Sequence, residues 1–82
     1  MPLTRDKIEQ KVASILIEQL GVDESQITQN ANLVHDLDCD SLDLVELVIS
    51  MEEAFDFEVT DEEGEKVRTV KDACDLIERK AS

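Results

Sequence analysis

The sequence is poor in the residues that make rigid cores and frequent turns. It has no tryptophan or tyrosine, and only two phenylalanines, two glycines and one proline among its 82 residues. A sandwich or barrel needs many turns, so this scarcity argues against an all-β fold and favours an all-α one. A chain of this length is expected to form a single domain, residues 1–82, with one modest aliphatic core and little room for a catalytic cleft.

Positive charge is missing from the middle of the chain. No lysine or arginine lies between Lys11 and Lys66, while residues 12–65 hold 16 of the 21 acidic residues, and the net charge is −13. Such a field repels nucleic acid and anionic membranes, and it attracts basic protein surfaces or divalent cations. An acidic face that serves only solubility is the alternative. Disordered acidic tails lack apolar residues in a regular pattern, whereas this chain has them. We therefore expect a folded acidic domain with a basic protein partner.

Disulfide and export signals are also lacking. The two cysteines, Cys39 and Cys74, form neither a CxxC pair nor a disulfide framework. No apolar signal peptide or membrane span is visible, and Asp6 and Glu9 are atypical of a transit peptide. These features predict free thiols and a cytoplasmic protein.

The first helix is predicted over residues 3–20. Thr4 is expected to be its N-cap, and Gly21 follows where a left-handed residue ends a helix. Apolar residues at helical spacing form one face, Ile8, Val12, Ile15, Leu16 and Leu20. Ile17 falls roughly opposite that face and is expected to be partly exposed, with burial as the alternative.

Residues 21–39 are expected to form a long ordered loop. A loop of this length is unusual in so small a domain. Apolar residues recur along it, however, and can hold it against the helices: Val22, Ile27, Leu33, Val34 and Leu37. Asp23 and Gln26 predict a short helical turn within the loop.

The stretch 36–55 contains the helix around which the chain is organised. Asp40 is predicted to cap it, with Asp43 three residues later and Ser41 in its first turn. Its apolar stripe comprises Leu44, Leu47, Val48, Met51 and Phe55. A second, polar face carries Asp43, Glu46, Ser50 and Glu53.

Two further helix starts follow. Thr60 and Glu63 form a capping box for a short helix that is expected to end near Gly64. Thr69 and Asp72 repeat the pattern for a last helix that runs to about Lys80. The predicted fold is therefore an irregular four-helix bundle with three main helices, one short helix and a long ordered loop after the first helix.

Catalytic and metal sites are not supported by the spacing. An EF-hand beginning at Asp36 requires Gly and Glu at its sixth and twelfth positions, which are Ser41 and Leu47. We therefore predict no metal site beyond weak surface binding of divalent cations. As a nucleophile Ser41 would need a base and an oxyanion hole, but no G-x-S-x-G elbow is present and the surrounding carboxylates disfavour an oxyanion. His35, the only histidine, is interpreted as a surface residue, and no catalytic residue is predicted.

The remaining feature is a hydroxyl at a helix start, surrounded by acidic residues. The neighbouring Asp40 and Asp43 make Ser41 a poor site for free phosphate. The arrangement fits a serine to which another protein attaches a group while it contacts the carboxylates. An ordinary serine in the first turn of a helix is the alternative.

The segment Asp40-Ser41-Leu42-Asp43 with the following x-Val45-Glu46-Leu47-Val48 resembles the attachment motif of acyl carrier proteins. The resemblance runs nearly end to end and includes Glu18-Gln19-Leu20-Gly21-Val22, Glu52-Glu53-x-Phe55 and Asp61-Glu62-Glu63-x-Glu65-Lys66. The tripeptide alone is a weak pattern, whereas its position within a full-length match is specific.

The resemblance implies a carrier and not an enzyme. Ser41 would hold 4′-phosphopantetheine, transferred from coenzyme A by a holo-acyl-carrier synthase, with acyl chains bound as thioesters to its terminal thiol. The partner-docking face would be Asp40, Asp43, Glu46, Glu52 and Glu53. The acyl pocket would include Leu33, Val34, Leu44, Leu47, Met51, Val67 and Ala73. The protein would act as a monomer that meets basic patches on the enzymes of fatty-acid synthesis, with no nucleic acid and no membrane span.

Three residues depart from the family pattern. Asp38 replaces a usual glycine, Cys39 takes the place of a small residue, and Thr60 stands where proline is common. Asp38 removes backbone freedom beside the attachment motif. Cys39 could undergo oxidative side reactions with the phosphopantetheine arm that Ser41 would carry. The alternatives to fatty-acid synthesis are a polyketide or other acyl pathway, or an acidic cation- or protein-binding module without a prosthetic group. The strongly acidic helix favours fatty-acid over peptide synthesis.

Overall fold

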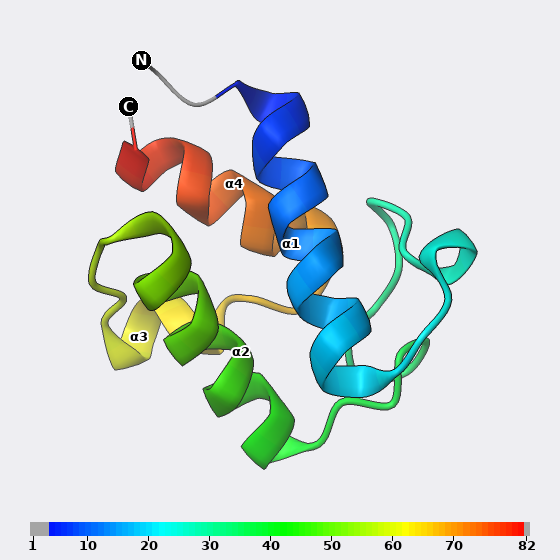
Figure 1. The fold of residues 1–82 in the computed structure, drawn as a ribbon. Helices are drawn as coiled ribbons and strands as arrows, with labels where there is room; N and C mark the ends of the chain where they lie inside the picture. Colours follow the sequence, from blue (N-terminus) through cyan, green and yellow to red (C-terminus); the bar gives the residue numbers. More distant parts are fainter. Residues whose placement is uncertain (1–3, 82) are drawn as a thin grey trace.

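The computed structural model describes residues 4–81, without the side chain of residue 81. The elements are α1 (Arg5–Leu20), the 3-10 turn η1 (Glu24–Gln26), α2 (Ser41–Phe55), α3 (Asp61–Glu65) and α4 (Val70–Ala81) (Figure 1). The described residues form no strand, and a single bridge pairs Asn32 with Thr69. The predicted all-α fold, with three main helices and one short one, is confirmed.

The core lies where α1, α2 and α4 meet. Each of these helices contributes one apolar stripe, and the buried side chains include Ile8, Val12, Leu16, Leu47, Met51, Val70, Cys74 and Ile77. The predicted stripe of α1 is confirmed, except that Leu20 is only partly buried. Ile17 is 37% exposed, as its position opposite the stripe predicts.

The helices begin and end where local chemistry dictates. The Thr4 hydroxyl accepts a hydrogen bond from the Lys7 amide at 3.3 Å, so Thr4 caps α1 and the helix begins at Arg5. The predicted start at residue 3 is two residues earlier and lies outside the described residues. Gly21 has φ 68°, and its amide donates to the Ile17 carbonyl. Thr60 and Glu63 form the predicted capping box of α3, and the Thr69 hydroxyl accepts from the Asp72 amide at 3.1 Å.

The long loop is ordered because its backbone pairs with the segment before α4. The Leu33 amide donates to the Arg68 carbonyl at 2.8 Å, and the Val70 amide donates to the Ala31 carbonyl at 3.1 Å. Leu33 and Leu37 are buried, as expected. Val34 is 45% exposed, so its predicted inward position in the loop is wrong. The reason is a tight turn in which the Asn32 side chain accepts from the Val34 and His35 amides.

The two poles of the bundle differ in charge. The start of α1 and the end of α4 lie at the same end of the molecule, whereas α2 begins at Ser41 at the opposite end (Figure 1). The first pole therefore carries Arg5, Arg79 and Lys80 beside acidic residues such as Glu78, whereas the charged residues at the start of α2, such as Asp40, are acidic. Along residues 4–81, no helix is both long and apolar enough to span a bilayer.

Arg5 links three parts of the chain at the pole where α1 begins. Its guanidinium donates to Glu9 at 2.9 Å within α1, to Asp75 at 2.8 Å on α4, and to the Gln29 side chain at 2.9 Å in the loop. Glu78 adds a weaker ion pair at 3.6 Å. Because the Arg5 side chain is only 27% exposed, this network should stabilise the fold more than an isolated surface pair does.

Arg5→Gln is expected to lower the free energy of unfolding by about 1 kcal/mol, which corresponds to a melting temperature about 4–8 °C lower. Lys71 and Arg5 hold the pKa of Asp75 below its ordinary value. The network's contribution is therefore complete above about pH 4 and is lost as pH falls through the lowered pKa. Thermal unfolding of both proteins from neutral to acidic pH should show the difference closing in acid. Lys11→Gln, an exposed charge change on the same helix, should show little difference at any pH.

Candidate functional site

Ser41 is the first residue of α2, and its side chain is exposed. The cap immediately before it is reciprocal. The Asp40 carboxylate accepts from the Asp43 amide at 2.9 Å, and the Asp43 carboxylate accepts from the Asp40 amide at 3.2 Å. Within the described residues the Ser41 hydroxyl has no hydrogen-bond partner of its own. The helix start is thus held by its neighbours, and the serine oxygen is left free for chemistry.

The backbone before Ser41 makes a sharp turn from the core to the surface. Leu37 and Cys39 are buried, and the Cys39 amide donates to the Leu33 carbonyl at 2.8 Å. Between them Asp38 has φ 58°, in the left-handed region. This is the position where the resemblance predicts glycine, and the structure gives the physical reason, because only glycine adopts such a φ without steric cost.

Asp38→Gly is expected to stabilise the fold by about 0.5 kcal/mol. Relief of left-handed strain contributes about 1 kcal/mol, and the greater freedom of glycine in the unfolded chain offsets part of it. Chemical denaturation would measure the change. Asp38→Asn is the matched control, since it removes the same charge but keeps a Cβ. Equal stability of the two variants would show that charge, and not backbone conformation, is responsible.

A groove begins at Ser41 and runs between α2 and α3; we call it the α2–α3 groove. Its volume is about 480 Å³. Its walls are largely apolar, and they are lined by Ser41, Leu44, Val45, Val48, Ile49, Glu52, Val59, Thr60, Asp61, Gly64 and Glu65. A free hydroxyl at the mouth of an apolar groove fits a site for a tethered group whose distal part is apolar.

A second groove adjoins the first on the side of the long loop. It also measures about 480 Å³ and is lined by Asn32, Val34, His35, Leu44, Gly64, Glu65, Val67 and Arg68. Leu44, Gly64 and Glu65 belong to both grooves. His35 therefore lines the second groove, whereas Ser41 lines only the first.

The predicted acyl-pocket residues fall into three groups. Five of them are buried in the core: Leu33, Leu47, Met51, Val67 and Ala73. Leu44 is partly buried and lines both grooves, and the exposed Val34 lines only the second. The predicted acyl pocket did not include the groove residues Val45, Val48, Ile49 and Val59. The available signal was that Val45 and Ile49 are apolar although they lie off the buried stripe of α2.

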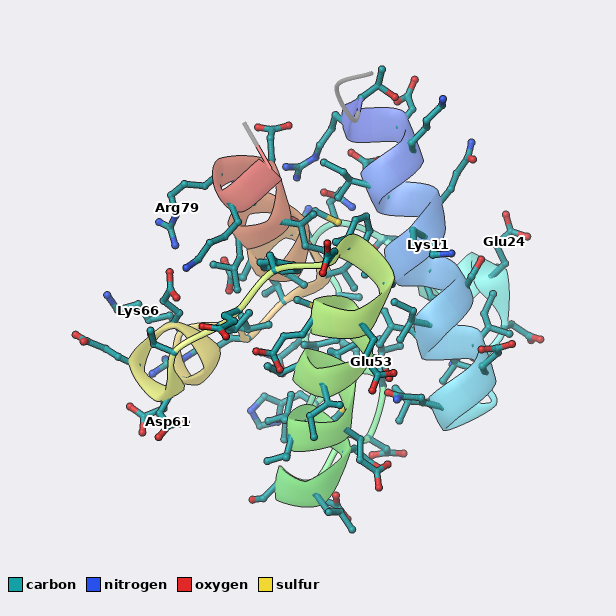
Figure 2. The ribbon with its side chains drawn as sticks, turned by 60° about the vertical axis from the view of Figure 1, so that its left-hand side comes forward. Lys11, Glu24, Glu53, Asp61, Lys66 and Arg79 are labelled. Atoms are coloured by element: carbon teal, nitrogen blue, oxygen red, sulfur yellow. The ribbon has the colours of Figure 1, made fainter. Side chains whose placement is uncertain are left out.

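The predicted docking carboxylates differ in how free they are. Asp40, Glu46 and Glu53 are exposed, and Figure 2 shows Glu53 on the outer side of α2. Asp43 is half-buried within the cap. Glu52 is also half-buried, and its carboxylate accepts from the Val59 amide at 2.8 Å, so it holds the connection to α3.

Exposed apolar side chains lie beside these carboxylates. Leu42, Val45 and Ile49 are 64%, 55% and 47% exposed, and their spacing of three and four residues places them on one side of α2. Together with Asp40, Glu46 and Glu53 they form what we call the acidic face of α2. A surface that combines charge with apolar area fits contact with a basic, partly apolar protein surface.

The remaining candidate groups do not point to catalysis or metal binding. Burial, and then the charges of Asp43 and Asp40, raise the pKa of the Cys39 thiol. Cys39 is therefore kept in its unreactive thiol form, which argues against the side reactions inferred from its position. Cys74 is also a buried free thiol. The part of the chain that the structure describes holds no cluster of three or more His, Cys, Asp or Glu side chains able to bind a metal ion.

Comparison with known proteins defines the class. Residues 10–77 match the family described as "Phosphopantetheine attachment site", and the chain belongs to that family. A relative from Rubrobacter xylanophilus, named acyl carrier protein, is 49% identical over 75 residues, which cover 92% of this chain and 93% of that protein. The solved structure of an acyl carrier protein from Enterococcus faecalis superposes with a TM-score of 0.81 at 36% identity, covering 95% of this chain and 99% of that one. Within the family the chain is an acyl carrier protein, which is a carrier and not an enzyme.

The described residues fit the prosthetic group that the family carries. Attachment requires an accessible hydroxyl that is not engaged elsewhere, and Ser41 meets that requirement. The α2–α3 groove supplies apolar surface directly beside it. The resemblance inferred from the sequence is confirmed, and the pathway served by the carrier is taken up below.

Proposed function

We propose that this protein carries growing acyl chains in fatty-acid biosynthesis, with 4′-phosphopantetheine attached to Ser41. One observation carries the assignment of the residue: an exposed hydroxyl that has no hydrogen-bond partner among residues 4–81, at the head of a well-capped helix and in the lining of an apolar groove. When attached, the arm supplies a thiol that holds the chain as a thioester. The protein's own residues present the arm, shelter the acyl chain and deliver it to the next enzyme.

Shelter is supported by the lining of the α2–α3 groove. Leu44, Val48 and Val59 offer apolar surface, and the removal of an acyl chain from water is favoured in proportion to the area that it buries. Buried residues such as Leu47 and Met51 lie behind the groove on the inner side of α2. A longer chain can reach them only if the helices move apart.

Delivery is supported by the acidic face of α2. Its carboxylates attract basic patches on the holo-acyl-carrier synthase and on the enzymes of chain elongation. Long-range attraction of this kind speeds encounter more than it strengthens the complex. That suits a carrier that must leave each enzyme after one step.

The pathway is supported by charge. A strongly acidic recognition helix favours fatty-acid synthesis over peptide synthesis. A polyketide pathway is the second candidate, because the same charge fits both the fatty-acid and the polyketide pathway. Elongation assays with purified enzymes of each pathway would decide between them. Loading and elongation by the fatty-acid enzymes is the expected result, and elongation by polyketide enzymes alone would overturn the proposal.

The site itself is tested by intact mass after incubation with coenzyme A, Mg²⁺ and a phosphopantetheinyl transferase. A single addition that peptide mapping locates on Ser41 is expected. No addition, or an addition at another residue, would contradict the assignment.

A further inference from the structure

The short helix α3 forms one wall of the α2–α3 groove but takes no part in the main helix contacts. Those contacts join α1 with α4, α1 with α2, and α2 with α4. None of the residues of α3 is buried. Figure 2 shows α3 lying to one side of α2, outside the bundle of the three long helices. Hydrophobic packing therefore does little to hold this wall in place.

The chain on either side of α3 is held firmly. Before it, the Val59 amide donates to the Glu52 carboxylate at 2.8 Å. After it, Val67 is buried, and the Arg68 carbonyl accepts from the Leu33 amide at 2.8 Å. The segment between residues 59 and 67 is thus a short span with two fixed ends, able to move outward as a unit.

The span is tied to α4 by one partly buried carboxylate. Glu63 Oε1 lies 2.8 Å from Lys80 Nζ, and Oε2 lies 3.8 Å from Arg79 Nη2. The Glu63 and Lys80 side chains are only 22% and 29% exposed, so water screens their pair less than it screens a surface pair. Figure 2 shows Arg79 extending from α4 on the same side of the molecule as α3. Hydrogen bonds from Lys80 and then Thr60 lower the pKa of Glu63 to about 2, so the carboxylate is charged at neutral pH.

α2, which forms the opposite wall of the groove, makes few contacts that would resist outward movement of α3. At Gly64 a Cβ, if present, would meet only Val48 Cγ2, at 3.8 Å. At this point α3 faces Val48 of α2 with a residue that has no side chain. Outward movement of α3 breaks few contacts there, and the ion pair with α4 becomes the main restraint.

We propose that the Glu63–Lys80 ion pair sets how far the α2–α3 groove opens, and so determines which acyl chain length the protein shelters best. Glu63 and Lys80 are positioning residues, because they lie outside the groove lining and act through α3. The part of the inference that concerns cargo rests on the proposed carrier function. The part that concerns α3 does not, and it can be tested on the unloaded protein.

The first test is amide hydrogen exchange on the unloaded protein. Glu63→Gln keeps a side-chain oxygen for the Thr60 cap but removes the charge that pairs with Lys80. Exchange of the α3 amides is expected to accelerate about two- to fivefold, with α1 and α4 unchanged. Lys80→Gln should have the same effect, and the double variant should add little to either single one. Glu62→Gln, the same change at an exposed neighbouring residue, is the matched control and should exchange like the parent.

The second test uses proteins loaded with saturated chains from butanoyl to hexadecanoyl, and measures the melting temperature of each form. The chain length that stabilises the parent most should shift to longer chains in Glu63→Gln and stay unchanged in Glu62→Gln. Faster α3 exchange with an unmoved optimum would overturn the role in chain length. Unaltered exchange would overturn the role of the ion pair altogether. Failure of Ser41 to accept the arm would instead contradict the proposed function and leave the exchange result valid.

Discussion

Ser41→Ala is expected to abolish covalent loading completely while leaving the fold unchanged. The reason is that the hydroxyl has no partner within the described residues and the helix start depends on Asp40 and Asp43. Alanine is a good residue in the first turn of a helix, so little stability should be lost. Intact mass after incubation with coenzyme A and a transferase measures the first effect, and thermal unfolding measures the second.

Ser14→Ala is the matched control for that experiment. Ser14 is an exposed serine on α1, remote in sequence from the attachment motif, and its variant should load to the same extent as the parent. A mass increase that persists in Ser41→Ala would move the attachment site elsewhere. Loss of loading together with loss of helical structure would mean that Ser41 serves the fold, contrary to its exposure.

Glu46→Lys is expected to slow association with the holo-acyl-carrier synthase about tenfold at low salt. Electrostatic attraction between complementary surfaces raises association rates by about 10–1,000-fold, and this change removes one charge and adds its opposite at the centre of the acidic face of α2. The effect should shrink as ionic strength rises, because screening removes the attraction in the parent as well. Stopped-flow association at several salt concentrations measures both.

The choice of carboxylate matters in this experiment. Glu52 is a poorer choice because its carboxylate holds the Val59 amide, so its reversal would disturb the connection to α3 as well as the charge. Glu24→Lys is the control, since it makes the same change at an exposed residue of η1, which Figure 2 shows away from α2. Equal slowing by the two variants would mean that net charge alone, and not the face of α2, governs encounter.

What the sequence predicted well depends on contacts within a few residues. The caps at Thr4, Asp40, Thr60 and Thr69 were predictable because each joins side chain and backbone three residues apart. The position of Ser41 at the start of α2 follows from the same local chemistry. The left-handed residue that ends α1, Gly21, was predictable because glycine adopts this backbone conformation most easily.

What could not be predicted depends on parts of the chain that are distant in sequence. The outward position of Val34 follows from a turn that the Asn32 side chain closes, and periodicity does not reveal such turns. The bond from the Val59 amide to Glu52, and the ion pair of Glu63 with Lys80, require the helices to be packed first. The groove residues were missed for the same reason, since α3 had no predictable position relative to α2.

The separation of charge between the two ends of the bundle has a mechanical consequence. Arg5, Arg79 and Lys80 belong to the start of α1 and the end of α4, which lie together at one end of the bundle. The start of α2 lies at the far end (Figure 1), and its neighbours in sequence include the acidic Asp38, Asp40 and Asp43. A molecule built this way is a permanent electric dipole in addition to a net anion. Near a positively charged surface it experiences a torque as well as a pull. We therefore expect the protein to rotate as it approaches such a surface, so that the end with Ser41 faces the surface and a larger share of collisions has the productive orientation.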